Sequence, residues 1–193
     1  MARLNNKIHE VIVTTVSSEN KPHSAPMGIR EVNGHFLIQP FKPSATYENL
    51  KQHRQCVINY TDDVRVFAGS LTGRRDWPSK QCHKIEGFYL EQALAHTELE
   101  IIEFDDADPR SCFTGQVVHE QTHAPFRGFN RAQSAVIEAA VLTSRLGMLS
   151  EEKIRQEITY LTIAIEKTAG ERELEAWGWL MDKIKQAGIT LND

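Results

Sequence analysis

The sequence predicts an α+β protein in which a small β-barrel is followed by helices. Between residue 9 and about residue 119, short apolar and β-branched runs alternate with turn residues. Asn33-Gly34 is the strongest short-range hairpin signal among these turns. From Asn130 onward, apolar residues recur with helical spacing instead. Strands joined mostly by hairpin turns favour a barrel over a sheet built from βαβ units.

Six strands are expected in the first part of the chain. The first, from His9 to Val16, is largely apolar and β-branched, and we expect it to be buried on both faces for part of its length. The other five are expected at 25–30, 35–41, 55–60, 93–104 and 111–119. Residues 73–87 are polar and are expected to form a loop.

A short helix is expected just after Pro43, and three longer helices are expected after residue 130. The apolar faces of the long helices are predicted from Val136, Ala139, Ala140 and Thr143, from Ile154, Ile158, Leu161 and Ile165, and from Leu174, Trp177, Met181 and Ile184. Gly147, Gly170 and Gly188 stand where these helices are expected to end.

Composition excludes several classes of protein. The 193 residues are 40% hydrophobic and 25% charged, which is typical of a folded domain and not of a disordered chain. The net charge of −4 offers no basic field for a nucleic acid. Three cysteines without CxxC spacing do not predict a disulfide framework. The absence of a signal-like N-terminus or a membrane-spanning apolar run predicts a cytoplasmic protein.

The segment Ser44-Ala45-Thr46-Tyr47-Glu48-Asn49-Leu50 carries the main functional signal. A helix start presents unpaired backbone N–H groups and the positive end of the helix dipole. Two hydroxyls at this start, with Asn49 on the same side and Lys42 just upstream, predict a phosphate site. We interpret it as the binding site for the phosphate of flavin mononucleotide (FMN). The alternative is ordinary helix capping by Ser44.

The segment Ala25-Pro26-Met27-Gly28 is the second candidate. Gly28 removes side-chain bulk, and Pro26 leaves a neighbouring backbone group outside the strand ladder. Such backbone suits a flat ring that needs donors and acceptors along one edge, as a flavin does. The alternative is a strand edge with a bulge.

These segments together resemble the FMN-binding split barrel of the flavin reductase superfamily. The resemblance rests on Val13-Thr14-Thr15, Ala25-Pro26-Met27-Gly28, Ser44-x-Thr46-x-x-Asn49-Leu50 and Val57-x-Asn59. The sequence around Pro26-Met27-Gly28 and Asn59-Tyr60-Thr61-Asp62-Asp63 is similar to that of one uncharacterised branch of this superfamily, found in archaea and bacteria, which has a helical C-terminal segment. The resemblance implies a split β-barrel of the Greek-key, FMN-binding type at 1–125, a helical extension at 126–193, and a homodimer.

The resemblance also assigns the cofactor-binding residues. Ser44, Thr46 and Asn49 match the phosphate motif, and Pro26, Met27 and Gly28 match the segment beside the ring. Asn59 and Asp62 match the strand end near the flavin. We add Arg131 because it begins a helix after the barrel and could reach the phosphate; the alternative is a solvated charge.

A rival interpretation comes from His119-Glu120-Gln121-Thr122-His123, which matches the zinc hydrolase pattern H-E-x-x-H. That chemistry needs both histidines one turn apart on a stable helix. Gly115, Pro125 and the strand-like Gln116-Val117-Val118 argue against a helix here. The alternatives are a strand end with two polar side chains, or a His123 that borders the flavin pocket.

Three functions follow from these patterns. The first is an FMN-dependent oxidoreductase that acts on a small molecule with NADH or NADPH as donor. The second is a non-catalytic FMN-binding or redox module, and the third is the zinc hydrolase. Because a flavin carries the redox chemistry itself, the first two require no catalytic residue and no metal ligand from the chain.

Overall fold

The computed structural model describes residues 7–107 and 111–191. These described residues divide into two compact units, the first within 1–61 and 77–125 and the second within 62–76 and 126–193. Residues 62–76, which precede the expected boundary at 125/126, belong with the helices in this division. This segment contains helix α2 (Arg65–Leu71). In the sequence, Thr61-Asp62-Asp63-Val64 is typical of a capped turn at the start of a helix. Val64 and Ala68 are both buried in the helical core, which explains why the helix continues to Leu71.

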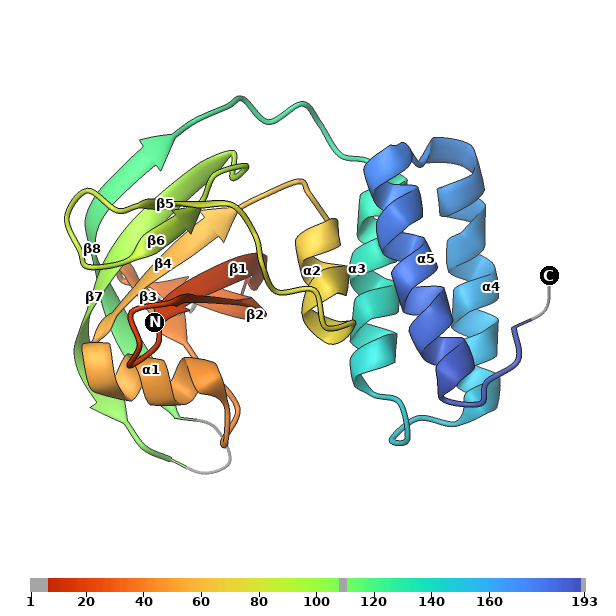
Figure 1. Cartoon of the computed structure of the whole chain (residues 1–193), viewed down its shortest axis with the longest axis horizontal. Coiled ribbons are helices and arrows are strands. Elements are labelled where there is room, and N and C mark those ends of the chain that lie inside the picture. The colour runs from red at the N-terminus through yellow and green to blue at the C-terminus, as the bar shows by residue number, and fades with distance from the viewer. Residues whose placement is uncertain (1–6, 108–110, 192–193) are drawn as a thin grey trace. The chain divides into compact units, whose positions relative to one another are not determined.

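The first unit is a closed barrel of six antiparallel strands (Figure 1). The strands are β1 (His9–Val16), β2 (Pro22–Val32), β3 (His35–Ile38), β4 (Gln55–Tyr60), β7 (Ala95–Asp105) and β8 (Cys112–Thr122). They pair in the order β1-β2-β3-β8-β7-β4, and β4 closes the barrel on β1. This architecture confirms the predicted fold class. β1 is buried from Val11 to Val16, where it is covered on both faces, and this confirms burial over part of its length.

The barrel interior is filled by one apolar cluster. Its buried members are Val11, Val13, Ile29, Phe36, Ile38, Tyr47, Leu50, Cys56, Ile58, Leu99, Ile101 and Phe113. Helix α1 (Ala45–His53) supplies Tyr47 and Leu50 to this cluster, so the short helix predicted after Pro43 is part of the barrel core. Gly115 is needed for close packing, because a Cβ at this position would lie 2.8 Å from Leu99 Cδ1.

A hairpin covers part of the outer face of the barrel. It consists of β5 (Ser79–Gln81) and β6 (Phe88–Leu90). β5 lies within residues 73–87, which we expected to form a loop, and β6 follows directly after them. Ile85 and Tyr89 from the hairpin bury Val57 of β4, whose neighbours Cys56 and Ile58 face the barrel interior. The expectation was wrong because strands of three residues show no alternating hydrophobic pattern, and β5 reads Ser-Lys-Gln.

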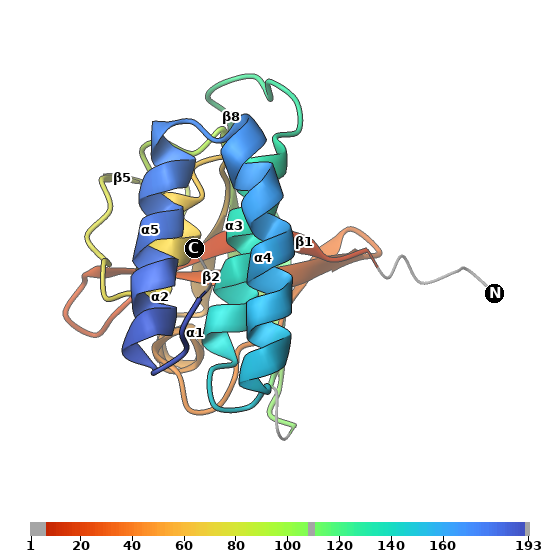
Figure 2. The ribbon, with the colours of Figure 1, turned by 90° about the vertical axis from the view of Figure 1, so that its right-hand side faces the viewer.

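The second unit is a helical bundle (Figure 2). Besides α2 it contains α3 (Arg131–Ser144), α4 (Glu151–Thr168) and α5 (Glu171–Gln186), and α3 packs against the other three. Asn130 and Ser150 cap α3 and α4 through their side-chain oxygens. In α5 the predicted face is shifted: Leu174 is 54% exposed, whereas Ala176, Leu180 and Ile184 are buried. Within the described residues, no helix is both long enough and apolar enough to span a bilayer.

Candidate functional site

Ser44 lies at the start of α1, as the phosphate interpretation requires. Its backbone is extended, with φ −153° and ψ 154°, and its Oγ accepts a hydrogen bond of 3.2 Å from the Tyr47 N–H. A serine hydroxyl accepts two hydrogen bonds and donates one, so capping leaves the Ser44 proton available to a ligand. Thr46 lies two residues further on and is 2% exposed. The capping alternative and the phosphate interpretation are therefore compatible at Ser44.

Asn49 holds α1 against the barrel. Its side-chain amide is buried and donates a 2.9 Å hydrogen bond to Thr15 Oγ1 on β1. The Thr15 hydroxyl in turn donates to the backbone carbonyl of His23 on β2, at 3.5 Å. The structure thus brings Asn49 onto the same helix as Ser44 and Thr46 and gives it a positioning contact that the sequence did not reveal.

Lys42, which we expected to strengthen the phosphate site, contacts a carboxylate instead. Its ammonium group pairs with Asp106, which also accepts hydrogen bonds from the hydroxyls of Tyr47 (3.0 Å) and Ser111 (2.8 Å). The Lys42 ammonium, the Ser111 hydroxyl and the Tyr47 hydroxyl together lower the pKa of Asp106 to about 2. This network fixes the segment that leads into α1.

The predicted ring-binding segment lies on a strand with one open edge. Residues 22–29 of β2 pair with β1, whereas pairing of β2 with β3 is restricted to Arg30–Val32 in the described chain. Pro26 and Met27 are half-buried and Gly28 is exposed. A Cβ at Gly28 would lie 2.7 Å from Ile8 Cγ2, so the Ile8 side chain already occupies the space beside this glycine.

Asn59 lies on the outer face of the barrel and is fully hydrogen-bonded. Its amide nitrogen donates to the Ile12 carbonyl and to Thr14 Oγ1, each at 3.0 Å, and its oxygen accepts from the Leu90 N–H at 2.7 Å. Neighbouring strand residues point to opposite faces, so Asn59 reaches β1 at Thr14 from the face opposite to Asn49 at Thr15. The structure therefore does not group Asn59 with the α1 residues.

Asp62 and Arg131 belong to the second unit. Asp62 is half-buried just before α2, and Arg131 is the exposed first residue of α3. The neighbouring Asp63 is buried and accepts a bidentate interaction from Arg65, with Nη2 to Oδ2 at 2.6 Å and Nε to Oδ1 at 2.9 Å. Asp63, next to the predicted site residue Asp62, is therefore the buried partner of an ion pair.

The H-E-x-x-H sequence lies on a strand and not on a helix. His119 and Glu120 are both in β8, where adjacent side chains point to opposite faces. Glu120 accepts a 3.1 Å hydrogen bond from Thr97, whereas His119 lies in a cluster with His83 and His96. The zinc hydrolase arrangement, with both histidines and the base on one helix, is therefore not formed.

A cluster that the sequence did not predict lies under the β5–β6 hairpin. Glu98 is fully buried, and its carboxylate accepts backbone N–H bonds of 2.7, 2.7 and 3.2 Å from His83, Lys84 and Ile85. Burial opposes ionisation of Glu98, but these N–H groups and His96 outweigh it and lower its pKa. Burial also lowers the pKa of His96, against the effect of Glu98. Period-2 spacing of His96 and Glu98 was the only signal in the sequence for this cluster.

The buried amide of Asn59 predicts a stability effect. Asn59→Ala removes the buried hydrogen bonds to the Leu90 N–H and to the Ile12 carbonyl, which we expect to lower the free energy of unfolding by about 2–4 kcal/mol. Hydrogen exchange at the Leu90 amide should accelerate in the same variant. Gln121→Ala, at an exposed position on β8, is the control and should leave both measurements unchanged. Equal stability of Asn59→Ala and the parent protein would contradict this role.

The Asp106 network predicts a pH dependence. The pKa of Asp106 is lower in the folded than in the unfolded protein, so its carboxylate stabilises the fold at neutral pH. This contribution should be constant above about pH 5 and should shrink as the pH falls from about 4 towards 2. The measurement is the difference in free energy of unfolding between the parent protein and Asp106→Asn, with Glu100→Gln as a charge control. A difference that does not change with pH would refute the network.

Comparisons with solved structures place this barrel and bundle among known folds. The crystal structure of the FMN-bound protein MM1853 from Methanosarcina mazei, described with the family DUF447, is 22% identical with a TM-score of 0.81. The match covers 93% of this chain and 96% of that one. BorF, the flavin reductase component of a bacterial two-component tryptophan halogenase, is 18% identical with a TM-score of 0.52, over 62% of this chain and 82% of BorF.

A similar fold occurs in an enzyme that is named for a different reaction. The 2-nitrobenzoate 2-nitroreductase NbaA of Pseudomonas fluorescens is 19% identical with a TM-score of 0.50, over 58% of this chain and 64% of that chain. These likenesses confirm the flavin reductase-like barrel that the sequence resembled. None of the curated proteins matches the chain.

Family comparison covers both units of the chain. Residues 9–124 match the N-terminal domain of a protein of unknown function, DUF447, and residues 130–182 match the following DUF447 region. Together the two matches span most of the described residues, from β1 to within α5. This chain therefore belongs to the DUF447 family.

Proposed function

We propose that this protein binds FMN and uses it to transfer electrons from NADH or NADPH to a small molecule. The observation that carries the proposal is the start of α1, where Ser44 and Thr46 stand at the positive end of a nine-residue helix. The FMN-bound state of the Methanosarcina mazei protein, which matches this chain over nearly its whole length, supports the choice of ligand.

The residues at the start of α1 suit a phosphate dianion. Ser44 is the N-cap, so Ala45 and Thr46 lie in the first turn of α1. Backbone N–H groups of a first turn have no hydrogen-bond acceptor within the helix. A phosphate there would receive hydrogen bonds from these N–H groups and from the two hydroxyls. Charge-assisted hydrogen bonds of this kind contribute about 1.5–3 kcal/mol each.

The open edge of β2 suits the flavin ring. Pro26 has no N–H, Gly28 has no side chain, and this part of β2 has its second edge unpaired with any strand in the described chain. α1 packs against both β1 and β2, so the phosphate and ring segments belong to one continuous surface of the first unit. FMN bound there would supply the hydride-accepting chemistry, while the chain anchors the phosphate and orients the ring.

The proposal includes a second copy of the chain. By resemblance to the flavin reductase superfamily, we propose a homodimer in which the partner copy helps to cover each ring. In this assignment Asn49 and Asn59 position α1 and β4. Asp62 and Arg131, which we predicted as FMN contacts from the sequence, lie in the second unit and carry no part of this proposal.

A double variant tests the phosphate site. Ser44→Ala with Thr46→Ala removes both hydroxyls, and we expect FMN affinity to fall by about 2–4 kcal/mol, measured by calorimetry on flavin-free protein. Ser144→Ala with Thr159→Ala removes two exposed hydroxyls from helices of the second unit and serves as the control. Unchanged FMN affinity in the first double variant would remove the phosphate assignment.

Steady-state oxidation of NADH and NADPH separates the two flavin hypotheses. An oxidoreductase consumes one of these donors when FMN and an acceptor are present. Tight FMN binding without any donor oxidation would instead favour the non-catalytic module.

A further inference from the structure

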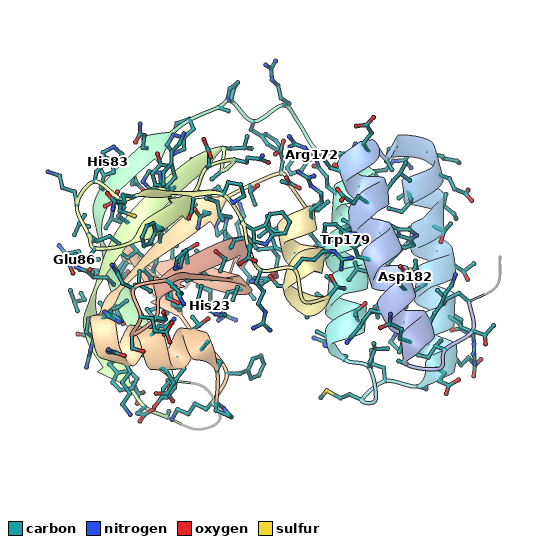
Figure 3. All side chains as sticks on the ribbon, in the orientation of Figure 1. His23, His83, Glu86, Arg172, Trp179 and Asp182 are labelled. Carbon is teal, nitrogen blue, oxygen red and sulfur yellow. The ribbon has the colours of Figure 1, made fainter. Side chains whose placement is uncertain are left out.

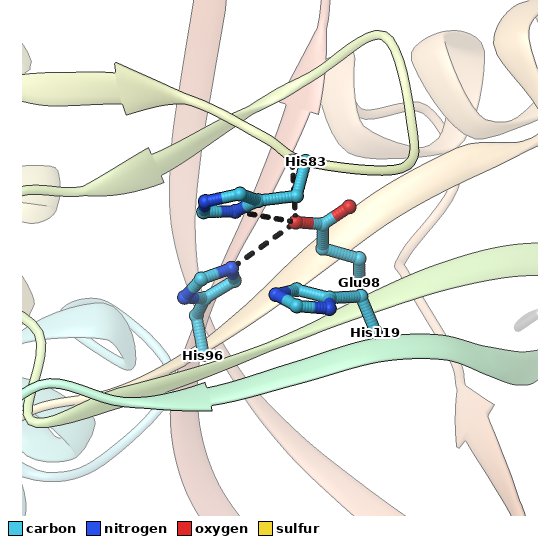
Figure 4. Close-up of side chains that lie close together, drawn as sticks. All are labelled: His83, His96, Glu98 and His119. Atoms are coloured by element: carbon cyan, nitrogen blue, oxygen red, sulfur yellow. Dashed lines mark hydrogen bonds and ion pairs between the residues drawn. The ribbon is translucent and has the colours of Figure 1, made fainter.

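The His83–His96–Glu98–His119 cluster lies in the space between the β5–β6 loop and strands β7 and β8 (Figure 4). One nitrogen of each histidine and one carboxylate oxygen of Glu98 all lie within 4.8 Å of one another. His83 comes from the β5–β6 loop, where Figure 3 also labels Glu86. The other three come from paired strands, so two separate parts of the first unit meet at this point.

The strand geometry explains why these side chains converge. His96 and Glu98 are two residues apart on β7 and therefore share one face. Glu98 stands directly opposite His119 of β8, and the register shifts by one residue immediately afterwards, because Leu99 pairs with Val117. Such bulges re-aim side chains and occur often beside functional sites. Here the bulge leaves Val118 as the extra residue next to the cluster.

Contacts within the chain account for only part of the cluster. The three backbone N–H bonds to Glu98 would by themselves hold the loop on the barrel. They do not account for His119, whose Nε2 is buried and has no hydrogen-bond partner in the described structure. His83 Nδ1 and His96 Nε2 both lie near Glu98 Oε1, at 3.5 and 3.2 Å. A buried imidazole nitrogen without a protein partner is satisfied by a water molecule or an ion, and here three further ligand groups stand beside it.

We propose that this cluster binds one Zn²⁺ ion, with His83, His96, His119 and Glu98 as ligands. Three imidazole nitrogens and one carboxylate oxygen form a donor set that zinc accepts, and four protein ligands complete a tetrahedral site. Ligand atoms around zinc stand about 3.4 Å apart, as follows from bond lengths of about 2.0–2.1 Å. The cluster must therefore contract slightly, and His83 can supply this movement because its side chain is 49% exposed on a loop.

His123 completes the site from outside the ligand set. Its Nε2 lies 2.8 Å from His96 Nδ1, so His96 can bind the metal through Nε2 while its Nδ1–H donates to His123. Ligating histidines usually make such a second hydrogen bond, which fixes the orientation of the ring. With four protein ligands the ion has a structural role: it fastens the β5–β6 loop to β7 and β8. The proposal uses Glu98 and not Glu120, and it is independent of FMN binding.

The test uses tag-free full-length protein that has been stripped with a chelator and then titrated with ZnCl₂ alone. We expect one zinc per chain by elemental analysis and calorimetry, and slower amide exchange in residues 82–87 after zinc is added. His119→Ala should weaken zinc binding by more than the roughly 10–100-fold that loss of an outer-shell partner costs. Because His119 Nε2 makes no hydrogen bond, this variant should still fold.

The matched control is His35→Ala, which removes a histidine on β3 that hydrogen-bonds the Asn33 carbonyl. It should bind zinc like the parent protein. His83→Ala gives a second ligand variant, on the exposed loop, and should lose zinc as His119→Ala does. Absence of stoichiometric zinc in the parent protein, unchanged affinity in His119→Ala, or equal loss in His35→Ala would each overturn the proposal.

Discussion

The first unit depends on how α1 completes the barrel core. β3 has four residues, and β2 pairs with it only over Arg30–Val32, so most of β2 has a strand neighbour on one side alone. α1 packs against β1 and β2, inserts Leu50 into the core and is fastened by the bond from Asn49 to Thr15. Apolar burial and one buried hydrogen bond therefore fix where the first turn of this helix stands. The proposed FMN phosphate site follows from that placement.

The outer face of the barrel is organised by a different constraint, the burial of polar side chains. Asn59 and Glu98 are both fully buried, and each is satisfied by backbone N–H groups of the β5–β6 hairpin. An uncompensated amide or carboxylate in that position would be costly, so the hairpin must dock for the face to be stable. The proposed zinc site would strengthen the same docking. These hydrogen bonds explain why the hairpin docks on the barrel, although its polar sequence does not predict a packed element.

The sequence predicted those elements whose pattern is long and regular. The six barrel strands and the three long helices were found from their apolar residues, and α1 was found from the capping chemistry that follows Pro43. α2 and the β5–β6 hairpin were missed because each is short and is stabilised by tertiary contacts, as Ala68 and Tyr89 illustrate. Among the site residues, Ser44 was predictable from capping chemistry. The meeting of His83 with His96 and His119 was not, because it depends on a bulge and on a loop closing over the sheet.

The central claim is that the start of α1 binds the phosphate of FMN. The most direct measurement compares the affinities of the flavin-free protein for FMN and for riboflavin, which lacks the phosphate but carries the same ring. Loss of the phosphate contacts should weaken riboflavin binding by about 2–4 kcal/mol, or roughly 30- to 700-fold in dissociation constant. Equal affinities for the two ligands, or no binding of either, would contradict the account.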